Sequence, residues 1–187
     1  MDDLNDQCLI LLQQAFMLEA ECFSDMTLED YPAITSVIDE WGDLREIPSM
    51  ENVSRFYDLN DSDDECIDED TLGAYNRKDM SIGIRLKSGK PVPTVLAHEM
   101  IHSYEHQLEN LNPALKEYVL VRLYSRLSRD IPDLEARMEQ HLEVTEHRSI
   151  ENGGGRHGLL FLLKSYDIDL KMGEPLGTVF GYGKHAS

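Results

Sequence analysis

Two histidines and a glutamate at fixed spacing are the residues of this chain best suited to chemistry. They lie in the segment His98-Glu99-Met100-Ile101-His102. On an α-helix, residues four apart share one face about 6 Å apart along the axis. Both imidazoles can therefore reach one ion at Zn–N distances of about 2.0–2.1 Å. Glu99 projects beside the pair, where it can take a proton from a metal-activated water, so the spacing indicates a zinc hydrolase.

The residues around the motif predict the helix that it needs. Pro91 and Pro93 precede it, and Thr94 is a candidate N-cap. The other positions of the segment are apolar: Val95, Leu96, Ala97, Met100 and Ile101. A His–Glu–His cluster in such a half-buried stretch costs desolvation energy unless it has partners. The pattern therefore favours a metal site over a surface helix that happens to carry two histidines.

A catalytic zinc ion needs a third protein ligand and an open position for water. The candidates downstream are His106, His141, Glu143, Glu146, His147 and His157. His106 continues the four-residue series, but it lies about 12 Å along the axis from His98 and roughly 80° around it. Since no glycine or proline interrupts the chain between His102 and His106, the helix geometry disfavours His106 as the third ligand.

The remaining candidates lie much further along the chain. Glu143 and Glu146 fall on a later predicted helix and would complete a site of two histidines and one glutamate. His157 follows a triple-glycine turn and precedes Gly158, which permits close backbone approach. On geometry alone, His157 ranks no higher than the two glutamates.

Four segments resemble the SprT-like zincin family of metallopeptidases. They are Tyr75, the strand 82–86, the segment 95–102 and His157-Gly158-x-x-Phe161, so the resemblance covers about residues 70–168. It implies His98, His102 and His157 as zinc ligands and Glu99 as general base. A second similarity, to the ImmA-type zincin peptidases, rests on the same strand and helix. That similarity would instead favour a downstream glutamate, Glu143 or Glu146, as the third ligand.

Length and composition indicate the number of domains and the cellular environment to expect for this chain. Its 187 residues fit a single domain with a substantial core. It has no run of 18 apolar residues, and acids precede its first apolar run, so we expect neither a membrane span nor a signal peptide. Cys8, Cys22 and Cys66 form no Cys-x-x-Cys pair, which is typical of the reduced thiols of a cytoplasmic protein.

The whole net charge lies in the first third of the chain. Residues 1–70 hold 21 acidic residues against Arg45 and Arg55, which gives −19, and residues 71–187 hold 15 acidic and 15 basic residues, which gives zero. Such a region repels nucleic acid and anionic membranes and attracts basic or regulatory protein partners. Simple solvation of the surface is the alternative role of these charges.

Hydrophobic periodicity predicts the elements that must position the motif. Helices are expected at residues 4–23, 32–41, 112–129 and 130–150, and an amphipathic helix from His157 onward. A strand is expected at 53–59, an acidic loop at 58–70, a hairpin at 72–86 and an irregular tail at 173–183. The buried stripe expected for the first helix is Leu4, Leu11, Leu12, Ala15, Phe16, Leu18 and Phe23.

Together these observations predict an α+β, zincin-like fold. A small mixed or antiparallel sheet would pack on the metal-binding helix, with additional helices around them. The expected organisation is one domain, 1–187, with an acidic N-terminal region (1–70), a metallopeptidase core (71–168) and a tail (169–187). The expected function is zinc-dependent hydrolysis of peptide bonds in a protein or peptide substrate. The alternative is a non-catalytic or vestigial zinc-binding module whose acidic region docks a basic partner.

Overall fold

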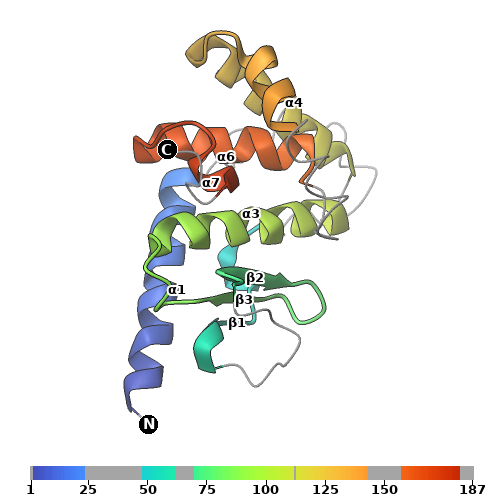
Figure 1. The fold of residues 1–187 in the computed structure, drawn as a ribbon. Coiled ribbons are helices and arrows are strands. Elements are labelled where there is room, and N and C mark those ends of the chain that lie inside the picture. The colour runs from blue at the N-terminus through green and yellow to red at the C-terminus, as the bar shows by residue number, and fades with distance from the viewer. Residues whose placement is uncertain (1, 24–47, 62–69, 112, 143–156, 182–187) are drawn as a thin grey trace. The chain divides into compact units, whose positions relative to one another are not determined.

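A computed structural model describes residues 2–23, 48–61, 70–111, 113–142 and 157–181 (Figure 1). The predicted helix at 32–41 and most of the acidic loop lie outside these residues. The chain divides into two compact units, Met1–Lys116 and Glu117–Ser187. The single domain expected from chain length stays a prediction. None of the described helices has the length and apolar composition that a bilayer-spanning segment requires.

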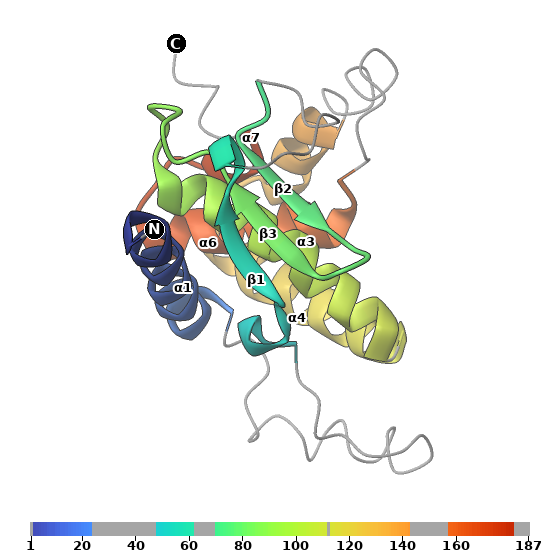
Figure 2. The same ribbon diagram turned by 90° about the horizontal axis from the view of Figure 1, so that it is seen from below.

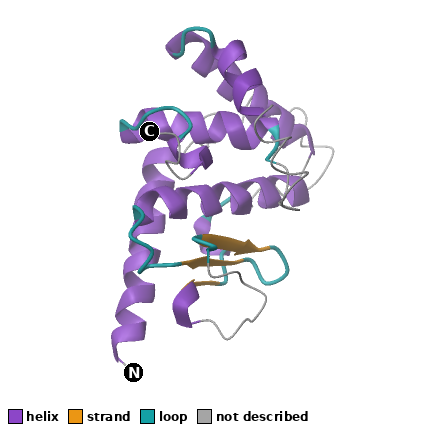
Figure 3. Cartoon of the chain, viewed as in Figure 1, coloured by secondary structure: helices purple, strands orange, loops and turns teal. Residues whose placement is uncertain are grey.

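The first unit combines two long helices with a small mixed sheet (Figure 3). Its main elements, in chain order, are α1 (Asp2–Cys22), β1 (Arg55–Asp58), β2 (Gly73–Asn76), β3 (Ser81–Ile84) and α3 (Val92–Leu111). The strand order is β1-β3-β2, with β1 parallel and β2 antiparallel to β3. Short 3-10 turns, Met50–Asn52 and Leu59–Asp61, flank β1. The expected α+β class, the strand and the hairpin are confirmed, and the sheet is mixed.

Helix α3 packs on this sheet through β2 and β3, and α1 contacts both β1 and α3 (Figure 2). The expected cap at Thr94 is wrong, because α3 already begins at Val92 and Thr94 lies buried in its first turn. Pro93 suits that turn, since its fixed φ is helical and its missing N–H would have no partner there. The metal motif therefore begins nearly two turns into the helix.

Helix α1 forms where the sequence predicts it, but its buried face is narrower. Leu11, Ala15, Leu18 and Cys22, spaced by three or four residues, are buried. Phe16 was expected in the stripe and is instead 38% exposed. It lies one position beyond Ala15, about 100° around the helix, which turns it away from the buried face.

In the second unit, the regular elements among the described residues are helices. Helix α4 (Pro113–Asp130) leads into it, residues 134–142 are helical, and α6 (Leu159–Met172) and α7 (Thr178–Gly181) follow. The helix expected from residue 130 thus begins at 134, after a turn in which Asp133 has a φ of 56°. The tail expected to be irregular contains α7, which packs on α6.

Helix α6 is not amphipathic, contrary to expectation. All ten residues from Leu160 to Asp169 are buried, including charged ones. Asp167 carries ion pairs to Lys164 at 3.1 Å, Arg126 at 2.6 Å and Lys171 at 2.9 Å. Because a buried charge is tolerated only when it is paired, this network allows a polar surface of α6 to be enclosed.

Candidate metal centre

Helix α3 holds the first two histidines of the motif against each other. The ring centroids of His98 and His102 are 5.1 Å apart, and the ring planes meet at 73°. His98 is 3% exposed, whereas His102 is half-buried. The four-residue spacing and the continuous helix therefore produce the paired imidazoles that the sequence predicts.

His157 stands two residues before the first turn of α6, where Gly158 is the N-cap residue. Its ring stacks on Phe161 at a centroid distance of 4.1 Å and meets the edge of Phe180 at 5.3 Å. Burial in these surroundings lowers the pKa of His157 to about 4. The imidazole is then neutral near pH 7, which is the form that binds metals.

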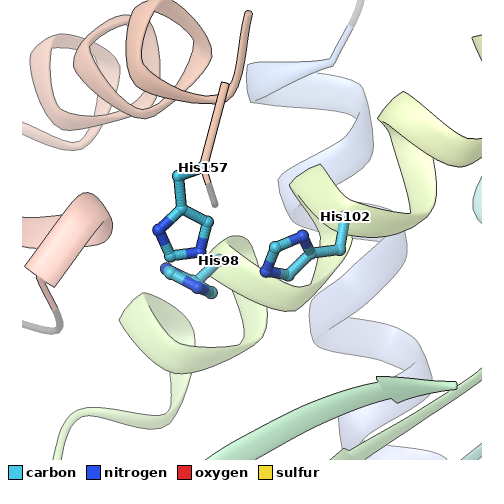
Figure 4. A group of neighbouring side chains, drawn as sticks. All are labelled: His98, His102 and His157. Atoms are coloured by element: carbon cyan, nitrogen blue, oxygen red, sulfur yellow. The ribbon is translucent and has the colours of Figure 1, made fainter. Parts of the chain in front are cut away.

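The structure brings these three histidines together (Figure 4). His98, His102 and His157 each offer a ring nitrogen, and these atoms all lie within 4.8 Å of one another. Tetrahedral zinc with Zn–N bonds of about 2.0–2.1 Å separates its ligand nitrogens by about 3.4 Å. Small side-chain movements therefore suffice to close the group on one ion, and an all-imidazole donor set suits zinc. The group could hold a metal ion.

The side chain of Glu99 extends from α3 toward strand β2 of the sheet. Its side chain is 3% exposed. A β-carbon placed on Gly73 of β2 would stand 2.7 Å from Oε1 of Glu99 and 2.8 Å from its Cγ. The carboxylate thus occupies space that any other residue at position 73 would fill. Sequence reasoning missed Gly73, although a glycine inside a strand is a general signal of close approach by another group.

The other histidines considered as ligands have different partners. Nδ1 of His106 lies 2.7 Å from the Tyr75 hydroxyl, and Nδ1 of His141 bonds the Tyr166 hydroxyl. Neither belongs to the three-histidine group. Glu143, Glu146 and His147 lie outside the described residues, so the structure does not bear on them.

Comparison with protein-family models, with curated proteins and with solved structures found no match.

Peptide hydrolysis also needs a donor to the developing oxyanion, and the sequence offers Tyr104, His147, Tyr182 and His185 as candidates. Tyr182 and His185 lie outside the described residues, as does His147. Tyr104 is 1% exposed, and its ring meets Phe23 at 5.6 Å in an edge arrangement. Such burial fits a packing role in the core of the first unit better than contact with a substrate.

Proposed function

We propose that this protein is a zinc-dependent metallopeptidase of zincin-like architecture that works in the cytoplasm. The observation that carries the proposal is the convergence of the ring nitrogens of His98, His102 and His157 within 4.8 Å of one another. Glu99, the neighbour of His98 in the chain, supplies the carboxylate that hydrolysis requires. The sequence forms no Cys-x-x-Cys pair from Cys8, Cys22 and Cys66, which agrees with a reducing compartment.

Each residue has a distinct part in the proposed reaction. A zinc ion held by the three imidazoles would polarise the scissile carbonyl and acidify the attacking water. Glu99 accepts the proton of that water and later passes it to the leaving amine. Gly73 leaves the space in which the Glu99 side chain lies, and the contact with β2 limits the orientations that this side chain can take.

The edge of the sheet offers a way to bind an extended peptide. Among the described residues, β2 pairs only with β3. Arg85 N–H donates to the Leu72 carbonyl at 2.8 Å, so in the alternating antiparallel ladder the main-chain groups of Gly73 and Tyr75 point away from β3. A substrate strand could pair with these groups. Because Gly73 also touches Glu99, such a peptide would lie close to the proposed general base.

Replacing Glu99 with glutamine tests the proposal. The variant should bind one zinc per chain, measured by elemental analysis, and should lose hydrolysis of fluorescein-labelled casein and of a random decapeptide library. The matched control is Glu105→Gln, which removes a buried carboxylate from the same helix outside the motif. If the wild-type protein with zinc cleaves neither probe, or Glu99→Gln cleaves as fast as the wild type, the peptidase proposal is wrong.

The acidic N-terminal region supports one alternative. Its net charge of −19 suits a basic protein partner, and the metal site would then be structural. A zinc-loaded protein that cleaves no peptide, but binds an oligolysine peptide in a salt-dependent manner, would favour this docking module.

A further inference from the structure

Tyr75 and His106 form a hydrogen-bonded pair where β2 meets α3. The Tyr75 hydroxyl lies 2.7 Å from Nδ1 of His106, and the rings meet edge to face with centroids 5.8 Å apart. Both side chains are half-buried. Tyr75 and Gly73 lie two residues apart on one strand, and both point toward α3, where Gly73 meets Glu99. The pair therefore stands next to the proposed general base along the strand.

Hydrogen bonds hold the side chains of Gln107 and Ser103 in place next to this contact. The amide of Gln107 is oriented because its Oε1 accepts from Ser49 N–H at 2.9 Å and from Asn52 Nδ2 at 2.8 Å. Its Nε2 then donates to Oγ of Ser103 at 3.1 Å. Burial raises the pKa of Tyr75, and a hydrogen bond with Ser103 lowers it by a smaller amount.

The contact favours one tautomer of His106. Burial raises the pKa of Tyr75, so its hydroxyl keeps its proton at neutral pH, and a phenol O–H is a better donor than a neutral imidazole N–H, which assigns the acceptor role in the 2.7 Å contact to Nδ1 of His106. A neutral imidazole that accepts at Nδ1 carries its proton on Nε2. Within the part of the chain that the structure describes, no group accepts a hydrogen bond from this Nε2–H. The Nε2–H of the half-buried His106 ring is thus a hydrogen-bond donor whose orientation is held by the contact of Nδ1 with Tyr75.

We propose that His106 is a substrate-binding residue whose Nε2–H donates to a carbonyl oxygen of the peptide that pairs with β2. The inference rests on the proposed peptidase function and adds a specific contact to it. The main-chain groups of Tyr75 at the outer edge of β2 and the ring of His106 would then hold one stretch of peptide. Tyr75 would act as a positioning residue, because it fixes the tautomer and the orientation of the donor.

Two substitutions of His106 separate substrate binding from a structural role. His106→Asn keeps an acceptor near Nδ1 for Tyr75 but has no donor at Nε2, whereas His106→Gln places an amide N–H near Nε2 and gives up the acceptor. With the decapeptide that the wild type cleaves fastest, we expect Asn to raise KM about tenfold at nearly unchanged kcat and Gln to keep KM within about threefold. Both variants should retain one zinc per chain. A higher KM for His106→Gln than for His106→Asn would mean that the Tyr75–His106 hydrogen bond only stabilises the packing of β2 on α3. That result would overturn the proposal.

A spectroscopic measurement tests the tautomer without any activity. In zinc-free protein labelled with 15N-histidine, long-range 1H–15N spectra should show His106 protonated on Nε2, with Nδ1 shifted by its hydrogen bond. Tyr75→Phe keeps the ring and should abolish that Nδ1 shift. A proton on Nδ1 in the wild type would overturn the proposal.

The activity measurements distinguish failure of this proposal from failure of the peptidase proposal. A wild type that cleaves no peptide would contradict both. Cleavage by the wild type, with a KM that His106→Asn leaves unchanged, would contradict only the role of His106 in substrate binding.

Discussion

Gly73 lies directly against Glu99, with room for a hydrogen but not for a methyl group. A β-carbon at position 73 would approach Oε1 of Glu99 to 2.7 Å and Cγ1 of Val95 to 2.8 Å. Real β-carbons do not come so close to other heavy atoms, so both side chains, or the strand itself, would have to move. The position of the Glu99 carboxylate, proposed as general base, therefore depends on the residue at position 73 of β2 being glycine.

Gly73→Ala should therefore lower kcat on the decapeptide substrate by about 100-fold, because a displaced carboxylate loses the geometry that general-base catalysis requires. Bound zinc should stay at one per chain. The control is Gly83→Ala on the neighbouring strand, where the added carbon would meet Leu59 and the Tyr57 ring instead. We expect that variant to lose stability without a selective loss of kcat. Equal kcat in Gly73→Ala and the wild type would contradict the proposed position of Glu99.

His157→Ala should lower the zinc content below one per chain, because only two imidazoles would remain in the group. Elemental analysis after dialysis against a weak chelator measures this content. His106→Ala is the matched control and should retain zinc, since Nδ1 of His106 bonds Tyr75. Unchanged zinc content in His157→Ala would move the third ligand to Glu143 or Glu146.

The contact between Gly177 and His141 should be visible in unfolding experiments. Gly177 has a φ of 92°, and a β-carbon there would lie 2.8 Å from Nε2 of His141, whereas Gly173, with a φ of 70°, has nothing within 4 Å. Alanine at either position costs roughly 1–2 kcal/mol of backbone strain. Gly177→Ala should cost about 1–3 kcal/mol more from overpacking.

Urea titration of both single variants measures that difference. In a His141→Ala background, the cost of Gly177→Ala should fall to that of Gly173→Ala. Equal losses of stability in the two single variants would argue against the contact with His141.

Asp169 should make the stability of the second unit depend on pH. Its carboxylate is fully buried and accepts the N–H groups of Gly177 at 2.7 Å and Val179 at 2.9 Å. Burial raises its pKa from 3.8 to about 7, against the effect of these hydrogen bonds. A raised pKa means that the folded state binds the proton of Asp169 more tightly than the unfolded state does. The stabilisation that this protonation gives is therefore complete below about pH 4 and is lost as the pH rises toward and through 7.

The expected slope for this group approaches about 1.4 kcal/mol per pH unit between its two pKa values. Urea unfolding at several pH values between 4 and 8 should show it in the wild type. Asp169→Asn keeps the shape and cannot titrate, so its stability should vary less over this range. Parallel curves for the two proteins would mean that Asp169 does not titrate there.

The parts of the fold that sequence predicts are those with a strong local pattern. The period of α1, the alternation of Ile82 and Ile84 in the hairpin and the apolar segment around His98 each specify an element on their own. The parallel pairing of β1 with β3 is not predictable in this way, because it joins residues 26 positions apart, such as Arg55 and Ser81.

The errors have a common physical origin in packing. The sequence predicts an amphipathic helix from His157 onward, yet ion pairs and backbone N–H groups allow Lys164, Asp167 and Asp169 of α6 to be buried. For the candidate site, helix geometry predicts the pairing of His98 with His102. It could not rank His157 above Glu143 and Glu146, since the position of a residue 55 places beyond His102 depends on tertiary structure.

The outward-facing main-chain groups of β2 also bear on self-association. An edge that can accept an extended peptide can accept the same strand of a second molecule, which is the first step of edge-to-edge aggregation. Lys78 in the turn that follows β2 is exposed, and a second copy whose β2 ran parallel to the first would bring the two Lys78 ammonium groups close together. These cations would discourage such a second folded copy at the edge, while a short peptide without such a turn would meet no comparable repulsion.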